Sequence, residues 1–345
     1  MEIVFLDITT ASTTSTLNVN NNDFNNFGHY ITGLGFGDIT FISNAGTHLN
    51  QSISNNTFTN MSVSTKGDIM FISNNNTLPA NGIKNINNNS IVTAFNKTVT
   101  GGTVVGYYDN GDSPTGTTHN NNNNNFSSIN TVGATITVWG NYDGAIGALP
   151  TKTIQNNTFT YITSAGANPI TAISASYSSS SSIITGNTIT DINCGNWLTA
   201  INLSSYTYFN VYSNTINNLN SASIVAISLG GNGANNFYMH DLNNFYAESS
   251  NTAIEVSSGI QNIYDNTIRS LSSSWSGSNA YPIVRGVYLL SAGTVNIYNN
   301  KIYDLSLLGN AGSSTAKIEG IGMLSGTDIT IYNNLLGDFR AALAT

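Results

Sequence analysis

Charged side chains are scarce in this sequence. Asp, Glu, Lys and Arg make up 8% of its 345 residues, against about 25% in an ordinary soluble protein. Only nine residues are basic, they are scattered along the chain, and the net charge is −8. Because phosphate binding needs clustered Lys and Arg, this charge pattern argues against nucleic acid and anionic membrane surfaces as partners.

Cysteine is also nearly absent. A single cysteine, Cys194, excludes an intramolecular disulfide and any metal cluster held by cysteines, and we expect it to be a small buried core residue. No apolar run is long enough to span a membrane. The start, residues 1–6, lacks the basic region and the long apolar region of a signal peptide. We expect the chain to begin and end inside a repeat array and to be part of a longer protein.

Asn, Ser, Thr and Gly take the place of the missing charges, while hydrophobic residues still make up 40% of the chain. A polar, uncharged composition can indicate disorder. Disordered segments, however, lack regularly spaced Ile, Phe and Tyr, and this chain has them in a strict repeat. The sequence therefore predicts a folded repeat protein.

The repeat reads Asn-Asn-x-apolar-x-x-apolar, as in residues 21–27, 55–61 and 299–305. We call its second Asn the ladder position. This position recurs every 26 to 35 residues, which is typical of a solenoid or a propeller. The ladder residues are Asn22, Asn56, Asn89, Asn124, Asn157, Asn187, Asn214, His240, Asn266, Asn300 and Asn334.

Apolar residues stand in fixed columns around the ladder position. The column two residues later is entirely apolar, and the column three residues earlier has one polar member, Asn121. The column five residues later runs Phe27, Met61, Ala94, Ile129, Ile162, Ile192, Leu219, Phe245, Leu271, Leu305 and Phe339. Such columns indicate one buried face that is repeated in every coil.

A further short strand with period-two alternation lies between successive motifs, for example in residues 198–203 and 295–297. Each coil thus has about three short strands. A propeller would need hairpin turns between antiparallel strands, and these signals are largely missing. We predict an all-β parallel β-helix of about eleven three-strand coils over residues 1–345. Long insertions are expected near 95–122 and 139–153.

Asparagine suits the ladder because its amide both donates and accepts hydrogen bonds, so that amides stacked at the strand spacing can bond to one another. Stacked carboxylates would repel each other instead. With these Asn-Asn-x-Ile motifs the chain resembles right-handed β-helix proteins of the pectin-lyase-like superfamily, and most of all large Asn/Ser/Thr-rich bacterial surface adhesins. The resemblance implies right-handedness and internal Asn stacks. At His240 a ring nitrogen is expected to replace the amide, with a metal ligand or proton-transfer group as the alternative.

Enzymes on this scaffold need carboxylates on one outer face. Asp191, Asp304 and Asp338 share a column one residue before the second apolar column, but Asp191 is four coils away from the other two. Asp265, Arg269, Arg285 and Asp304 fall on neighbouring coils and could form a lyase-like cluster. Solvated charge pairs are the preferred interpretation of these residues.

Calcium is the one metal that the sequence leaves open. Asp109, Asp112, His119 and Asp143 lie in the predicted insertions, where they could converge on a Ca²⁺ ion. Their spacing matches neither an EF-hand nor a repeat-in-toxin loop. We otherwise expect no cofactor.

Five tyrosines stand two residues before the ladder position of the last five coils, whereas earlier coils have small polar residues there. Alternation with the adjacent inward column predicts that they form an outward row with stacked rings. The row could stabilise the sheet or bind sugar rings or a protein. Its members are Tyr212, Tyr238, Tyr264, Tyr298 and Tyr332.

These patterns favour a structural or adhesive stalk or binding module of an extracellular bacterial surface protein. The alternative is a carbohydrate-active enzyme, a polysaccharide lyase or hydrolase of the pectin-lyase-like type. The expected partner is a glycan or a protein surface. Because neither end has a recognisable cap, adjoining segments or an assembly partner are expected at the open strand edges of the terminal coils.

Overall fold

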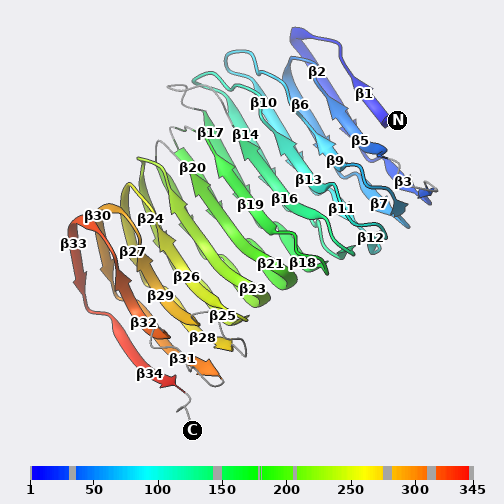
Figure 1. Ribbon diagram of the computed structural model, residues 1–345. Coiled ribbons are helices and arrows are strands. Elements are labelled where there is room, and N and C mark those ends of the chain that lie inside the picture. The colour runs from blue at the N-terminus through cyan, green and yellow to red at the C-terminus, as the bar shows by residue number, and fades with distance from the viewer. Residues whose placement is uncertain are drawn as a thin grey trace.

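The computed structural model describes residues 2–30, 36–142, 150–177, 179, 181–204, 208–274, 282–308 and 316–341. These residues contain strands and no helix, so no helix among them is long and apolar enough to cross a membrane. All strand pairs are parallel, and the chain winds into an elongated solenoid with the termini at opposite ends (Figure 1). The protein is a parallel β-helix.

One sheet contains a single strand from each coil and therefore counts eleven coils. Its strands run in chain order along the solenoid: β2 (Ser12–Asn20), β6 (His48–Ser54), β10 (Ile83–Asn87), β14 (Thr118–Asn122), β17 (Thr151–Gln155), β20 (Ser181–Thr185), β22 (Phe209–Tyr212), β24 (Ala234–Tyr238), β27 (Ile260–Tyr264), β30 (Ala292–Tyr298) and β33 (Gly326–Tyr332). We call it the eleven-stranded sheet.

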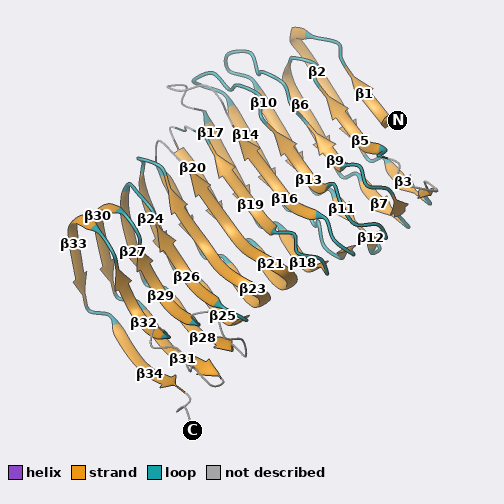
Figure 2. Ribbon diagram, in the orientation of Figure 1, coloured by secondary structure: helices purple, strands orange, loops and turns teal. Residues whose placement is uncertain are grey.

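A twenty-stranded sheet forms the rest of the wall and bends around a corner (Figure 2). On the part that precedes the eleven-stranded sheet in each coil lie β1 (Glu2–Ile8), β5 (Asp38–Asn44), β9 (Ile69–Ser73), β13 (Thr103–Asp109), β16 (Thr135–Tyr142), β19 (Ile170–Ser176), β26 (Ser250–Val256), β29 (Ile283–Leu289) and β32 (Lys317–Met323). Two long strands, β21 (Thr188–Ser204) and β23 (Thr215–Gly230), run continuously around the corner.

The part that follows the ladder position contains β4 (Gly28–Tyr30), β8 (Ser62–Ser64), β12 (Phe95–Lys97), β15 (Ile129–Thr131), β18 (Thr158–Ser164), β25 (Asp241–Ala247), β28 (Thr267–Ser274), β31 (Lys301–Leu308) and β34 (Leu335–Ala341). A small three-stranded sheet of β3 (Asp23–Asn25), β7 (Thr57–Thr59) and β11 (Ser90–Ile91) lies beside it in the first three coils.

The two bends that flank the ladder motif require a left-handed backbone. The residue before every ladder position has φ between 52° and 65°, from Asn21 to Asn333. In ten of the eleven coils the residue four positions after the ladder also has positive φ. Asn and Asp tolerate this conformation better than most residues. The acidic column of Asp191, Asp304 and Asp338 is thus explained by its place in a bend.

The apolar columns fill the interior, where nearly all their members are fully buried. One expected position is wrong. In the third coil Ala94 is exposed, and Phe95 occupies the buried column in register with Ile129. An extra residue in this coil shifts the bend, and the third coil is also the one without the second positive-φ residue.

The ranges predicted as long insertions contain strands of the regular coil. The range 95–122 contains β12, β13 and β14, and the range 139–153 includes the end of β16 and the start of β17. These strands pair in register with their neighbours in the adjacent coils. Side chains such as Tyr107 and Trp139 in these ranges are fully buried, whereas residues 143–149 lie outside the described residues.

Candidate functional site

The Asn ladder forms two hydrogen-bonded stacks inside the first bend, one on each side of His240. From Asn22 to Asn214, and again from Asn266 to Asn334, the side-chain Nδ2 of each residue donates to the Oδ1 of the next at 2.8–3.0 Å. The backbone N–H of each rung donates to the same oxygen. Nδ2 also donates to a backbone carbonyl of the previous coil, as from Asn157 to Asn121 at 2.9 Å. The predicted stack is therefore a structural element.

His240 interrupts this stack. Its Nε2 donates to the carbonyl oxygen of Val211 at 3.1 Å, and its backbone N–H donates to Oδ1 of Asn266. Its Nδ1 is buried and has no hydrogen-bond partner. Burial lowers the pKa of His240 to about 4, against the smaller opposing effect of its backbone hydrogen bonds. The ring is therefore neutral at physiological pH, which fits a structural role.

The five tyrosines form an outward row on the last five strands of the eleven-stranded sheet. Consecutive ring centroids from Tyr212 to Tyr298 are 4.9 Å apart, the last pair, Tyr298 and Tyr332, is 5.0 Å apart, and the interplanar angles are 13° or less. The rings lie face to face along the solenoid axis. Each inner ring face is thus covered by a neighbour, so the row presents ring edges and hydroxyl groups to the solvent.

A second ladder runs beside the tyrosines, two residues earlier on the same strands. The Asn236 side chain donates to Asn210 and Asn262 donates to Asn236, both at 2.9 Å, and Asn296 donates to Asn262 at 2.8 Å. The sequence prediction missed this row, although the repeated Asn-x-Tyr could have indicated it. We call the two rows together the Tyr–Asn strip.

The electrostatics of the Tyr–Asn strip keep the hydroxyl groups of its three middle tyrosines neutral. Partial burial, followed by repulsion from neighbouring tyrosines, raises the pKa of Tyr238, Tyr264 and Tyr298. The hydroxyls therefore remain hydrogen-bond donors and acceptors. The strip is a regular array of phenol and amide groups, suited to an uncharged ligand rich in hydroxyl groups.

Three of the four residues of the possible lyase cluster form separate pairs, and the fourth, Asp265, lies in a bend with φ of 55°. Arg269 binds Asp241 at 3.2 Å, and Arg285 binds Glu319 at 2.6 Å. Asp304 accepts a bond from Ser270 at 2.8 Å and forms an ion pair with Arg340. These are distinct charge pairs at partly exposed positions, as the preferred interpretation expected.

A different group of residues clusters around Arg285 on the outer face of the twenty-stranded sheet. Its guanidinium carbon lies 3.6 Å from the ring centroid of Tyr288. Glu255 is in register with Tyr288 on the neighbouring strand. Burial raises the pKa of Glu255, and attraction to Arg285 partly opposes this. The sequence prediction missed Glu255 and Tyr288 because nothing in the repeat marks them.

The residues considered for calcium do not share a surface. Asp109 and His119 are fully buried, Asp112 is exposed, and Asp143 lies outside the described residues. Asp109 binds Lys84 at 2.8 Å, and its second oxygen lies 3.4 Å from Nδ1 of His119. In the part of the chain that the structure describes, no three His, Cys, Asp or Glu residues are grouped so as to hold a metal.

Asp109 instead belongs to a buried polar cluster inside the third to fifth coils. Lys84 also donates to the backbone oxygens of Asn74 and Asn76. Lys152 donates to Asn141 at 3.2 Å and lies 4.3 Å from the ring centroid of Tyr177. Burial opposes ionisation of Asp109, but attraction to Lys84 and His119 outweighs burial and holds the pKa well below its usual range.

His119 stays neutral in this buried cluster. Burial and the positive charge of Lys152 lower its pKa to about 3. One signal for the cluster was overlooked in the sequence: the column five residues before the ladder contains Gln51, Lys84, His119 and Lys152 in succession.

Comparisons with known proteins find no matching family model and no matching curated protein. Two solved structures are similar. The A-module of the mannuronan C-5 epimerase AlgE6 from Azotobacter vinelandii is 11% identical, with 81% of this chain and 91% of that chain covered and a TM-score of 0.24. The periplasmic alginate epimerase AlgG is 8% identical, with 89% and 77% covered and a TM-score of 0.27. Likenesses of this size carry no argument for function.

Proposed function

We propose that this chain is a binding module of an extracellular bacterial surface protein, and that the Tyr–Asn strip binds a neutral linear glycan. The observation that carries the proposal is the face-to-face stack of five tyrosines, with centroids 4.9–5.0 Å apart, beside a hydrogen-bonded Asn row. A regular row of neutral donors and acceptors fits a polymer whose hydroxyl groups also recur at regular intervals.

The stacking geometry specifies how the glycan would be recognised. Sugar rings cannot stack on faces that neighbouring tyrosines already cover, so hydroxyl groups and ring edges must make the contacts. The net charge of −8 disfavours acidic polysaccharides as ligands. The chain would therefore prefer neutral glycans and hold them along the solenoid axis.

Two double variants test this proposal. Tyr264→Phe with Tyr298→Phe keeps the ring stack and removes two phenol hydroxyls. Tyr264→Ser with Tyr298→Ser removes the two rings as well as their hydroxyls. We expect the Phe pair to weaken binding to a soluble neutral β-linked glucan about thirtyfold, at about 1 kcal/mol for each of the two lost hydrogen bonds, with little change in thermal stability. Affinity electrophoresis measures the binding, and a polyuronate serves as the charged comparison.

The strip would be purely structural if the Ser pair lost stability while both double variants bound glycan as the unmodified chain does. Asn87→Ser, on the outward face of an early coil without tyrosines, is the matched control. It should leave binding unchanged.

A second candidate function is a carbohydrate-active enzyme, and the cluster of Glu255, Arg285 and Tyr288 favours it. A carboxyl group with a raised pKa beside an arginine and a tyrosine is an arrangement that can transfer protons. Incubation with neutral and acidic polysaccharides should then release new chain ends, and Glu255→Gln should abolish the release. Absence of any release by the unmodified chain would exclude this candidate for the polysaccharides tested.

A further inference from the structure

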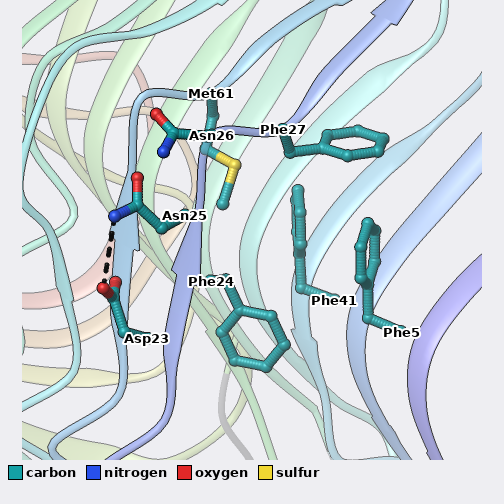
Figure 3. Close-up of a pocket in the computed structure, with 8 residues that line it drawn as sticks. All are labelled: Phe5, Asp23, Phe24, Asn25, Asn26, Phe27, Phe41 and Met61. Atoms are coloured by element: carbon teal, nitrogen blue, oxygen red, sulfur yellow. Dashed lines mark hydrogen bonds between the residues drawn. The ribbon is translucent and has the colours of Figure 1, made fainter.

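Two enclosed places of the solenoid lie apart from the Tyr–Asn strip. The first is a cavity of about 350 Å³ in the first two coils, lined mainly by phenylalanine rings such as Phe24 and Phe41 (Figure 3). Its one carboxylate, Asp23, accepts a hydrogen bond from Asn25. The second is the buried polar cluster of the third to fifth coils, which contains amines, an amide and a carboxylate. Of the two places, the second brings a nucleophile next to a side-chain carbonyl group.

The three fully buried lysines of the described chain have different partners. Lys84 binds the carboxylate of Asp109 at 2.8 Å, and an ionised carboxylate resists attack by an amine. Lys97 donates to three backbone oxygens. Among these three lysines, Lys152 is the one that donates to a side-chain amide, with its Nζ 3.2 Å from Oδ1 of Asn141. An uncharged amine is a nucleophile, and an amide carbon is a group that it can attack.

The register of the coils places Lys152 and Asn141 in a square of four inward side chains. Asp109 on β13 and Asn141 on β16 are register partners on one wall of the solenoid. His119 on β14 and Lys152 on β17 are register partners on the wall across the interior. Nδ1 of His119 lies 3.4 Å from a carboxylate oxygen of Asp109 across this interior. All four side chains are fully buried, so bulk water does not reach the amine or the amide.

Two polar atoms of this square have no hydrogen-bond partner, Nδ2 of Asn141 and Nδ1 of His119. Nδ2 is thus not held in place by a hydrogen bond that would oppose its departure. Burial, followed by the charge of Lys152, lowers the pKa of His119 to about 3, so the ring is neutral. In the tautomer that donates from Nε2 to Ser113 at 2.8 Å, Nδ1 is free to accept a proton. Asp109 beside it would stabilise the resulting positive charge.

The amine of Lys152 must be uncharged to react. Burial disfavours the ammonium form of a lysine, and Lys84, whose charge already pairs with Asp109, disfavours a second positive charge in the same cluster. The ring of Tyr177, whose centroid is 4.3 Å from Nζ, attracts the ammonium form instead and holds the amine in position. A proton acceptor such as His119 is therefore part of the site.

We propose that Lys152 and Asn141 form an intramolecular isopeptide bond. The uncharged Nζ attacks Cγ of Asn141, so that a new N–C bond forms and the Cγ–Nδ2 bond breaks. One proton moves from Nζ through His119 to Nδ2, which leaves as ammonia. The atoms balance without any oxidant or further reactant. The product links β16 to β17 across the interior and removes one buried positive charge, which is costly to keep out of water.

Mass spectrometry of the purified, denatured chain tests the proposal. We expect the intact mass to be lower than the sequence mass by one ammonia. Tryptic digestion locates the link, because trypsin does not cleave after a lysine whose amine is part of an amide. A single peptide of residues 98–269, lighter by one ammonia, should therefore replace the peptides 98–152 and 153–269.

Three variants assign the loss of ammonia to this pair, and circular dichroism checks that each variant folds. Lys152→Met and Asn141→Ala each remove one partner and should restore the full mass. Lys97→Met, at the buried lysine that faces backbone oxygens, is the matched control and should keep the link. Asn-Gly sequences such as Asn81-Gly82 can also lose ammonia by forming a cyclic imide, but they are intact in all three variants. An unmodified chain of full mass that trypsin cleaves after Lys152, or a loss of ammonia that persists in Lys152→Met, would overturn the proposal.

Discussion

The third to fifth coils and the last five coils of this solenoid use the same fold with opposite placements of their distinctive side chains. In the third to fifth coils the unusual residues are inside, where Lys84, Asp109, His119 and Lys152 are fully buried. In the last five coils the interior holds no buried ionisable cluster among the described residues, and the unusual residues are the tyrosines outside. The comparison shows that the ladder and the apolar columns define the coil, and that other positions are free to vary.

The buried ion pair should be the most sensitive point of the molecule. Asp109→Asn leaves the charge of Lys84 buried without its carboxylate, which should destabilise the fold by about 3–5 kcal/mol. Urea unfolding measures the loss, and hydrogen exchange should place it in β10, β13 and β14.

The matched control lies in the late coils. Asp241→Asn removes one partner of the partly exposed pair with Arg269, and exposed pairs contribute less than about 1 kcal/mol. Equal losses for the two variants would contradict the contrast between a charged interior in the early coils and surface charge pairs in the late ones.

Acid sensitivity in the late coils should come from His240. Its folded pKa of about 4 lies below the ordinary value of 6.5, so between these values the unfolded chain binds a proton that the folded chain does not. Stability is thus lost as the pH falls from about 6.5 to about 4, by about 3 kcal/mol in total at 1.36 kcal/mol per pKa unit. His240→Asn should remove this part of the pH dependence in urea unfolding.

The same substitution should also restore the ladder between Asn214 and Asn266 and leave stability near neutral pH equal or higher. If His240→Asn and the unmodified chain lose stability in parallel on acidification, the buried imidazole is not the cause. His119, with its pKa lowered to about 3, would then be the next residue to test.

The ladder itself joins the two regions and should be equally important in both. Asn187 lies at the border between them. Its side-chain Nδ2 donates to Oδ1 of Asn214 in the next coil and to the carbonyl oxygen of Ile154 in the previous coil. Asn187→Leu leaves buried amides without partners and should cost about 1–3 kcal/mol. Asn262→Ala, in the partly buried Asn row of the Tyr–Asn strip, removes bonds of similar length but should cost less, because water can reach the groups that lose their partners. Thermal unfolding of both variants measures the difference.

Sequence reasoning predicted the parts of this molecule that recur at a fixed position from coil to coil. The ladder, the apolar columns and the tyrosine row each occupy one fixed position per repeat, so a pattern reveals them. The buried cluster was missed although three of its members share the column five residues before the ladder, because the residue type in this column changes from coil to coil and because charged residues usually indicate surface. Asp109 was assigned to a surface loop, whereas β13 continues to that residue and turns its side chain inward.

The smallest change in stability is expected when the tyrosine row of the late coils is extended by one residue into an earlier coil. Thr185 is in register with Tyr212, the first ring of the row, and points outward from the neighbouring strand β20. Thr185→Tyr should place a sixth ring on the free face of Tyr212. Because stacked aromatic pairs contribute about 0.5–1.5 kcal/mol beyond their buried area, and part of this is offset by ordering an exposed side chain, we expect a gain of about 0.5 kcal/mol in thermal unfolding. Thr185→Leu adds apolar area without an aromatic ring and is the control. A gain in stability with Thr185→Tyr alone would show that ring stacking stabilises the outer face. Equal gains with Thr185→Tyr and Thr185→Leu would mean that the row stabilises the sheet only through apolar burial, and ligand binding would remain as the reason for tyrosine.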